Sequence, residues 1–583
     1  MINFNKYRNI IIWKIIEIKE NRLHLEGEDR CWLPRNKYFY YCIFGNKKFY
    51  PKYYNFKNYN FDTLYGTLLK GRIIIFDIFL DLNTEQILDF YISLNYNNIE
   101  IFPSLEYLNH LPPINNSYYI AENYIIKNYN NHLYIYNNRN QEKLFEQNFC
   151  IELKKIQKDY LIELRKNYII DKKLIEYKKN NQIWLINDNA YKAGDNGEFF
   201  FRYLTQINPK DIQYYFIISK NCSDYYRLKS FHNIIDYNSS THLNIFLKAN
   251  KIITSVTDSW VNNPYGENGR YIQDLYHFEY IYLKNGIIKD DISKFLNRII
   301  FNFDLIVTSS KKEYKSFLNN NYGYYKNNLL LTGLPKYDNL KAMQKKLIKQ
   351  NIILISPTWR MFIKGTRDLL NHKSIKSENF KNTTYYNFYN DLINNKQILN
   401  YMKENNYYGI FCLHPNFAEQ SSHFKQNEIF KVKKFCNIQK LLVVSSLLIT
   451  DYSSIFFDFA YLQKPIIFTH FDYNEYRKKH FPKGYFDYKR DGFGKICYNL
   501  NCTIEEIKYE ITNKMVMQKV YIRRAKRFFK YSDELNCYRT YVSILESKNK
   551  FKQDKRFICL DNIFNFIILY ILIFKIKIIN NNN

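Results

Sequence analysis

Residues 447–459 read LLITDYSSIFFDF. The apolar run at residues 447–449 ends in a polar turn at residues 450–454, and an apolar pattern at helical spacing starts directly after it. This pattern predicts a buried strand, a tight turn and a helix that begins at Ser453 and Ser454. Such a helix start offers unpaired backbone N–H groups, two hydroxyls and the positive end of the helix dipole, which together suit a phosphate group. An ordinary serine helix cap explains the turn as well, so the neighbouring segments must decide.

The sequence on both sides of this stretch alternates short apolar runs with helical patterns, from about residue 181 to 545. A first series of predicted strands lies at 182–186, 214–218, 251–255, 305–309 and 329–333, and a second series at 352–356, 409–413, 447–450 and 465–468. Apolar strands that end in polar turns before helices predict parallel sheets with helices on both faces. Two such series in tandem predict an α/β fold with two Rossmann-like lobes, 181–345 and 346–545, and a ligand cleft at the carboxyl ends of the strands.

The remaining segments predict accessory parts. Residues 1–140 show short alternating segments broken by turn residues, which predicts a small antiparallel, sandwich-like β domain with an accessory or docking role. Residues 141–180 are rich in Lys, Glu, Leu and Ile and predict a helical connector.

The tail, residues 546–583, is basic and apolar. Its longest clean apolar run, Phe566 to Phe574, is too short for a span, which takes roughly 20 residues. Lysines and arginines on both sides suit a helix that lies in an anionic membrane interface. A buried C-terminal helix that packs on the lobes is the alternative, and both interpretations stay open.

Composition limits the classes of partner. At 583 residues, 46% hydrophobic and 19% aromatic, the chain is long and apolar enough for several packed domains. Its formal charge of +30 fits nucleic acid, an anionic membrane or an anionic polymer. An A+T-rich coding genome, however, also produces such an excess of Lys, Asn, Ile, Tyr and Phe. Since no Lys/Arg block, zinc-finger spacing or RNA-binding signature occurs, we expect no nucleic-acid partner.

The ten cysteines, scattered from Cys31 to Cys559, form no CxxC pair and no Cys/His cluster. This pattern argues against a structural zinc site and a disulfide framework, and it favours a reduced cytoplasm. The apolar run from Ile10 to Trp13 is too short for a secretory signal. We therefore expect a peripheral protein at the cytoplasmic face of the membrane, in contact with its inner leaflet.

Four polar segments fall where strands of the second lobe should end. Arg360, after Thr358 and Trp359, offers a guanidinium that can clamp a phosphate with two hydrogen bonds. His414 precedes a proline at another strand end. The turn with Asp451, Ser453 and Ser454 is the third segment, and Asp458 follows one helical turn later on the same face. Together they predict a diphosphate site, although each residue alone has an ordinary structural explanation.

These segments resemble the CDP-glycerol glycerophosphotransferases, the polymerases and primases of teichoic acids and related capsules. The resemblance covers roughly residues 181 to 545. It rests on Thr358-Trp359-Arg360, on His414-Pro415, and on Ile449-Thr450-Asp451-Tyr452-Ser453-Ser454 with Phe457-Asp458-Phe459. Supporting matches are Asp195-Asn196-Gly197-Glu198, Phe201-Arg202-Tyr203-Leu204 and Gly333-Leu334-Pro335-Lys336-Tyr337-Asp338.

The resemblance implies a GT-B fold and an enzyme that transfers glycerol phosphate from CDP-glycerol, or another CDP-polyol, to an anionic polyol-phosphate or glycan acceptor, with release of CMP. The acceptor would be lipid-linked. In the resulting hypothesis His414, Ser453, Ser454 and Arg360 contact the diphosphate. Thr358 lies in the same donor-binding segment, and Asp451 and Asp458 organise the turn or contact hydroxyls of the polyol or ribose. No all-protein metal site is visible, and Mg²⁺ acting through the diphosphate stays an open possibility.

One departure from the family concerns catalysis. The family carries a His-Gly pair whose histidine is the proposed base for the attacking hydroxyl, and the matching residues here are Asn285 and Gly286. An amide cannot accept a proton at neutral pH, although it can hold a hydroxyl by hydrogen bonding. Asp290, Asp291 and His277 are nearby candidates for a replacement base. The sequence leaves three hypotheses: a CDP-polyol phosphotransferase, a GT-B glycosyltransferase that uses a nucleotide sugar, and a non-catalytic CDP-polyol-binding subunit.

Overall fold

The structure, a computed structural model, describes residues 142–547 apart from 171–172, 299–300, 319–321 and 364–373. Within the first 141 residues it describes twelve strands and residues 50, 51 and 80. The predicted membrane-interfacial tail therefore lies outside the described residues, except for its first two positions. Among the described residues, no helix combines the length and the apolar character that crossing a bilayer takes.

The N-terminal strands form two sheets, with the orders β5-β6-β2-β1-β9 and β10-β11-β12-β7-β3-β4. All their pairs are antiparallel except β1 with β9. The strands are β1 (Ile10–Lys19), β2 (Arg22–Asp29), β3 (Tyr38–Phe44), β4 (Lys47–Phe49), β5 (Lys52–Asp62), β6 (Leu68–Phe79), β7 (Gln86–Leu94), β8 (Glu100–Ile101), β9 (Ser104–Tyr107), β10 (Tyr118–Ala121), β11 (Tyr124–Tyr129) and β12 (His132–Tyr136).

A helical connector joins these strands to the rest of the chain. It consists of α1 (Glu142–Lys155), α2 (Asp159–Arg165), a π-helical turn at Lys166–Ile170, and α3 (Lys173–Asn180). Arg165 and Glu146 form a fully buried ion pair in it. Tyr118 of β10 donates a hydrogen bond to Glu146, and Arg165 donates one to the carbonyl of Tyr271. The connector thus fastens the β strands to the first lobe.

The first lobe contains a parallel sheet with the order β15-β14-β13-β16-β17-β18-β19. Its strands are β13 (Ile183–Asn187), β14 (Gln213–Ile218), β15 (Ile234–Asp236), β16 (Lys251–Thr254), β17 (Glu279–Tyr282), β18 (Leu305–Thr308) and β19 (Leu329–Leu331). Its helices are α4 (Asn196–Ile207), α5 (Ser223–Leu228), α6 (Ser240–Lys248), α7 (Ser259–Asn262), α8 (Lys311–Phe317) and α9 (Lys336–Lys346).

The second lobe contains a parallel sheet with the order β22-β21-β20-β23-β24-β25. Its strands are β20 (Ile352–Ile355), β21 (Tyr408–Cys412), β22 (Phe430–Lys433), β23 (Leu447–Thr450), β24 (Ile466–Thr469) and β25 (Lys495–Cys497). The helices that follow β20 are α10 (Thr384–Asn394), α11 (Lys396–Glu404), α12 (Ile438–Val444), α13 (Ile455–Tyr461), α14 (Tyr473–Lys479), α15 (Tyr488–Asp491), α16 (Leu500–Thr512), α17 (Lys519–Phe528) and α18 (Asn536–Glu546).

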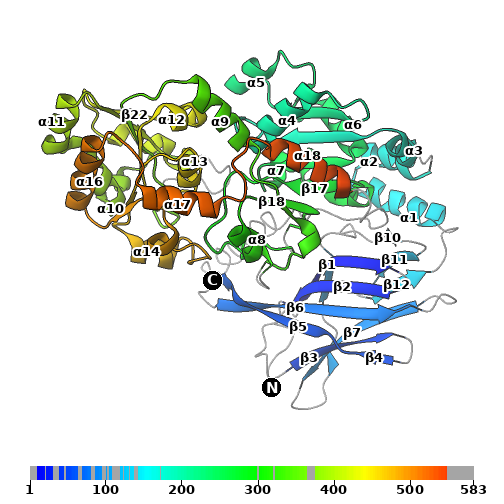
Figure 1. Cartoon of the computed structure of the whole chain (residues 1–583). Coiled ribbons are helices and arrows are strands. Elements are labelled where there is room, and N and C mark those ends of the chain that lie inside the picture. The colour runs from blue at the N-terminus through cyan, green and yellow to red at the C-terminus, as the bar shows by residue number, and fades with distance from the viewer. Residues whose placement is uncertain are drawn as a thin grey trace.

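Both sheets are buried on both faces, which explains why their strands read as continuous apolar runs. Trp184 and Ile186 of β13 enter one hydrophobic cluster, whereas Ile183 and Leu185 enter another on the opposite face. Successive side chains of a strand point to opposite faces, so a strand with two buried faces needs apolar residues throughout. Figure 1 shows the two lobes side by side. This is the predicted α/β architecture of GT-B type, with two Rossmann-like lobes after a small β-rich part.

The last described helix departs from the predicted boundary. We expected residues 346–545 to form the second lobe, but α18 packs against α4 and α9 of the first lobe (Figure 1, red). Asp338 of α9 accepts hydrogen bonds from the backbone N–H groups of Asn536 and Cys537. A Cβ on Gly333 would lie 1.9 Å from Oδ1 of Asn536, so only a glycine allows this close approach.

A disulfide is the second departure. The structure pairs Cys412, the last residue of β21, with Cys436, and their Cα atoms are 6.5 Å apart. The sequence argued against a disulfide framework and gave no indication of this one pair. Scattered cysteines give no local signal for a contact between segments that are 24 residues apart.

Candidate functional site

Each sheet has a point where the order of its strands reverses. Chain order runs outward from β13 to β15 and returns at β16 in the first lobe, and it runs from β20 to β22 and returns at β23 in the second. Ligands of open α/β sheets bind outside the carboxyl ends of the strands at such switch points. Residues 356–358 and 451–454 lie at the switch point of the second lobe. Residues 188–197 and 255 lie at that of the first.

Asp451 holds the second switch point together. Its carboxylate is fully buried, and its Oδ1 accepts hydrogen bonds from the backbone N–H groups of Thr358, at 2.7 Å, and Tyr452. Thr450 also donates a hydrogen bond to the carbonyl of Ser356 at 2.7 Å. These bonds tie the segment after β20 to the turn after β23. Asp451 is thus placed to organise the turn, one of the two roles considered for it from the sequence.

The structure places Arg360 differently from the sequence prediction. Its guanidinium is fully buried, and it pairs with Asp451 at 2.8 Å and with Asp472 at 2.6 Å. The Nη1–H of Arg360 also donates a hydrogen bond to the carbonyl of Thr358 at 2.6 Å. Four aromatic rings surround the guanidinium, those of Tyr385, Tyr452, Phe471 and Tyr476. A clamp on a diphosphate is therefore not the role that this conformation gives it, because its donors are already used to support the turn.

Ser453 and Ser454 are half-buried and lie at the start of α13. Ser454 makes no side-chain cap hydrogen bond, whereas Oγ of Ser453 accepts a long hydrogen bond of 3.5 Å from the backbone N–H of Ile455. Ser454 faces the first lobe: a Cβ built on Gly286 would lie 2.7 Å from its Oγ. Gly286 and Ser454, which are far apart in the sequence, therefore meet where the lobes face each other.

His414 directly follows Leu413 at the end of β21 and is half-buried. Its Nδ1 accepts a hydrogen bond from the backbone N–H of Asn416 at 3.2 Å. In the neutral ring the proton is therefore on Nε2, which suits a hydrogen bond to an anionic oxygen. Since β20 lies between β21 and β23, His414 is about 10 Å along the same sheet edge from the serine turn. The ring of Trp359 lies between these positions in the strand order, 6.2 Å from the His414 ring.

Asn285 and Gly286 follow β17 at the carboxyl edge of the first sheet. Asn285 is exposed, whereas Lys284 before it is fully buried and adopts a left-handed conformation, with φ of 65°. Lys284 pairs with the buried carboxylate of Glu313, and Glu313 also accepts the backbone N–H of Ile288 at 2.9 Å. The loop is thus anchored on both sides of Asn285, and the amide of Asn285 is presented to solvent.

Asp458 joins the two lobes. Its carboxylate is buried and pairs with Lys336 of the first lobe at 2.9 Å. The same ammonium group donates to the carbonyl of Asn285 at 2.7 Å and lies 3.7 Å from Asp195. Burial raises the pKa of Asp458 and Lys336 lowers it, with a net rise above the ordinary value. Contact with a ligand hydroxyl would require this pair to open, so a structural role fits better.

Lys336 and Asp195 are site residues to which the sequence assigned no role. They belong to segments quoted for the resemblance, but neither stands at a strand end, the signal used to select candidates. Sequence reasoning also passed over His470 and His480. Burial lowers the pKa of each to about 3, so both rings are neutral at pH 7 and do not supply positive charge to a diphosphate.

The three candidates for a replacement base, Asp290, Asp291 and His277, have different surroundings in the structure. Asp290 is buried and pairs with Lys289 and with Arg477 of the second lobe. Burial raises the pKa of Asp290, but Lys289 and Arg477 together lower it by more, so the net pKa lies below the ordinary value. His277 precedes β17 and so lies at the opposite end of that strand from Asn285. Asp291 donates its backbone N–H to Pro482 of the second lobe and accepts a bond from Ser293.

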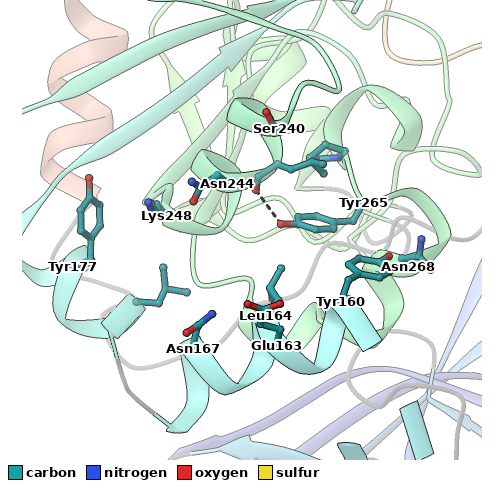
Figure 2. A pocket seen from close by; sticks show the side chains of 13 residues that line it. Tyr160, Glu163, Leu164, Asn167, Tyr177, Ser240, Asn244, Lys248, Tyr265 and Asn268 are labelled. Atoms are coloured by element: carbon teal, nitrogen blue, oxygen red, sulfur yellow. Dashed lines mark hydrogen bonds between the residues drawn. The ribbon is translucent and has the colours of Figure 1, made fainter. Parts of the chain in front are cut away.

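A large cavity lies elsewhere, between the connector and α6 of the first lobe. It is an open pocket of about 790 Å³, and Figure 2 shows Tyr160 and Glu163 on one wall with Asn244, Lys248 and Tyr265 on the other. None of the predicted site residues lines it. Among the described residues, no group of three or more His, Cys, Asp or Glu side chains is arranged to hold a metal ion.

Comparisons with known proteins agree with the sequence resemblance. Residues 168–546 match the family described as "CDP-Glycerol:Poly(glycerophosphate) glycerophosphotransferase". The minor teichoic acid biosynthesis protein GgaB of Bacillus subtilis is 39% identical over 370 residues, which are 63% of this chain and 40% of that protein. The teichoic acid glycerol-phosphate primase of Bacillus subtilis is 28% identical over 254 residues, 42% of this chain and 58% of the primase.

The chain thus spans less than two thirds of the length of these relatives. The solved structure of the wall teichoic acid polymerase TagF superimposes with a TM-score of 0.45 at 14% identity, over 66% of this chain and 97% of TagF. The family match covers more than half of the chain, including both lobes and every candidate site residue. The chain belongs to the CDP-glycerol:poly(glycerophosphate) glycerophosphotransferase family.

Proposed function

We propose that this protein is a CDP-glycerol glycerophosphotransferase that transfers glycerol phosphate to an anionic, lipid-linked acceptor and releases CMP. The observation that carries the proposal is the close approach of Gly286 in the first lobe to Ser454 in the second, in a chain that belongs to this family. This contact brings the serine turn of the second lobe next to the exposed amide of Asn285. A donor held by the turn and an acceptor held by Asn285 would therefore share one space.

The second lobe would bind the diphosphate of the donor. Ser453 and Ser454 offer hydroxyls and the first backbone N–H groups of α13, and His414 offers its Nε2 hydrogen on the same sheet edge. The backbone N–H of Thr358 is bonded to Asp451, so Thr358 would contribute its hydroxyl, which lacks a partner among the described residues. Arg360 and Asp451 would hold this arrangement in place rather than touch the substrate. Donors that are already oriented stabilise developing negative charge without further reorganisation.

The reaction would be an in-line displacement at the phosphorus that carries glycerol. The acceptor hydroxyl forms the new P–O bond, the bond to the CMP oxygen breaks, and CMP leaves with the electron pair. Phosphoryl transfer commonly has a loose transition state, so positioning and charge stabilisation dominate its catalysis. Asn285 suits this demand, since its amide can orient a hydroxyl even though it cannot take the proton.

Other elements of the proposal concern location and partners. The product chain is anionic, and a protein with a formal charge of +30 would hold it. The protein would act at the cytoplasmic face of the membrane, in teichoic acid or capsule synthesis. Mg²⁺ would be recruited by the diphosphate rather than by a site made of protein side chains alone.

Asn285 itself favours a second candidate, a non-catalytic subunit that binds a CDP-polyol or the polymer. The absence of a general base typically slows a reaction about 10²–10⁴-fold. A loss of that size would make the protein one that binds its ligand without effective turnover. Such a subunit would bind CDP-glycerol but release no CMP.

The test is CMP release by the full chain from CDP-glycerol, with a lipid-linked glycerol phosphate acceptor. Native chain, Asn285→His and His414→Ala are compared, and CDP-glycerol binding is measured for each by calorimetry. CDP-ribitol and a UDP-sugar serve as alternative donors. Turnover by the native chain that falls at least tenfold in His414→Ala is expected.

Other outcomes separate the alternatives. Activity only in Asn285→His would identify an intact site that lacks its base, and binding without turnover in all three proteins would favour the non-catalytic subunit. Transfer from the UDP-sugar, with no phosphate in the product backbone, would identify a glycosyltransferase. A chain that does not bind CDP-glycerol refutes the donor assignment.

A further inference from the structure

The loop that carries Asn285 has a carboxylate neighbour. Asn196, the first residue of α4, donates its side-chain N–H to the carbonyl of Lys284 at 2.7 Å, and its Oδ1 accepts the backbone N–H of Lys336 at 3.0 Å. Lys336 in turn donates to the carbonyl of Asn285 at 2.7 Å. Asp195, directly before Asn196, is therefore held against the Asn285 loop through two of its neighbours.

Asp195 lies at the switch point of the first sheet. It caps the N-terminus of α4, where its Oδ1 accepts the backbone N–H of Asn196 at 2.9 Å. Its backbone N–H is bonded to Asp188 at the end of β13, and Gly197 packs so closely there that a Cβ would lie 2.6 Å from the carbonyl of Asn187. The position of the carboxylate is thus set by the tight junction between β13 and α4.

The carboxylate is only partly covered. About 30% of the Asp195 side chain is exposed, compared with 6% for Lys336 and 6% for Asp458. Within the described part of the chain, hydrogen bonds reach Oδ1 but none reaches Oδ2. Compared with it, Asp458 is buried, Glu313 is fully buried, and Asp290 is paired with two cations, so of these four carboxylates Asp195 has the accessible oxygen.

We propose that Asp195 is the general base of this protein, accepting on Oδ2 the proton of the acceptor hydroxyl that Asn285 orients. This inference rests on the proposed function. The hydroxyl O–H bond breaks as the new P–O bond forms, CMP departs with the electron pair of the broken P–O bond, and the proton moves from Asp195 to solvent after product release. Lys336 acts as a positioning residue, since it bonds the carbonyl of Asn285 and lies 3.7 Å from Asp195.

The electrostatic surroundings suit this role. Burial raises the pKa of Asp195 to about 7, the ammonium of Lys336 opposes that rise, and the carboxylates of Asp188 and Asp458 add to it. These groups come from α9, from the end of β13 and from α13, so they are the charges that face Asp195 from the elements around it. A base is most effective when its pKa lies near the working pH.

The test compares Asp195→Asn with the native full chain in the CMP-release assay. An asparagine keeps the cap acceptor of α4 and the size of the side chain, but it cannot take the proton. We expect kcat to fall by about 10²–10⁴-fold with little change in CDP-glycerol binding. Asp236→Asn is the matched control, because Asp236 is a partly exposed carboxylate, 26% accessible, at the end of β15 in the same lobe. It should keep the native rate.

Rescue separates a base from a structural residue. In the Asp195→Asn background, Asn285→His supplies a new proton acceptor beside the hydroxyl and should restore most of the lost rate. The pH profile of kcat in the rescued variant should then follow the histidine. An unchanged rate in Asp195→Asn, or a loss that Asn285→His cannot repair, would refute the assignment of Asp195 while native turnover upholds the transferase. Absence of turnover in the native chain would refute the proposed function itself.

Discussion

At the scale of single residues, Arg360 shows how burial decides what a charged group can do. Its guanidinium is paired with two carboxylates and enclosed by rings. Removing one partner from a buried ion pair leaves an uncompensated charge and typically costs about 3–5 kcal/mol. Arg360→Met should therefore lower the midpoint of guanidinium chloride unfolding strongly, as followed by circular dichroism.

Arg490→Met is the control for this prediction, since the Arg490 side chain is 66% exposed and solvent screens its pair with Asp491, so the unfolding midpoint should change little. If Arg360 instead bound the diphosphate, Arg360→Met would unfold like the native chain and lose only affinity for CDP-glycerol.

Gly286 tests how closely the lobes must approach. A methyl group there would overlap the Oγ of Ser454 at 2.7 Å, so the lobes or the turn must shift. Overpacking of this kind typically costs 1–3 kcal/mol, and if the cost falls on the assembled site, CMP release should drop roughly 10- to 100-fold in Gly286→Ala. Steady-state rates at saturating CDP-glycerol measure the effect.

A double-mutant cycle isolates the contact. Ser454→Gly removes both atoms that the new methyl would meet, so Gly286→Ala should add little further loss in that background. Additive losses in the double variant would show that the two residues act independently.

At the scale of elements, the strands were predictable because their burial pattern is local. Residues 447–449 and 352–355 are apolar throughout, since β23 and β20 contribute side chains to clusters on both faces of the sheet. The serine turn was predictable as well, because its polar residues directly follow the apolar strand in the sequence. The partners of Arg360 and Lys336 were not, because a sequence pattern shows that a side chain is charged but not which distant carboxylate it meets. The crossing of α18 to the first lobe depends on such distant contacts too.

The docking of α18 can be weakened selectively. Asp338 accepts three hydrogen bonds from the start of that helix, two from Asn536 and one from Cys537. Loss of a capping acceptor typically costs about 1 kcal/mol. In Asp338→Ala we expect amide hydrogen exchange of residues 536–546 to become at least about fivefold faster. Asp533→Ala, which removes a half-exposed partner of Arg539, should change it less. Equal protection in both variants would contradict this account of the docking.

At the scale of the whole molecule, the formal charge of +30 has two explanations, a biased genome and an anionic polymer partner. Electrostatic attraction over a surface is screened within about 10 Å at 0.1 M salt, whereas codon usage implies no ligand at all. If the charge serves the acceptor, the affinity for poly(glycerol phosphate) should fall about tenfold between 0.05 and 0.5 M NaCl, and more steeply for longer polymers. Fluorescence anisotropy with labelled polymers of two lengths measures this without requiring turnover. CDP-glycerol, which carries far fewer charges, is the control, and its affinity should change much less. If the affinity for the polymer does not depend on salt or on polymer length, the biased genome alone would explain the excess of lysine.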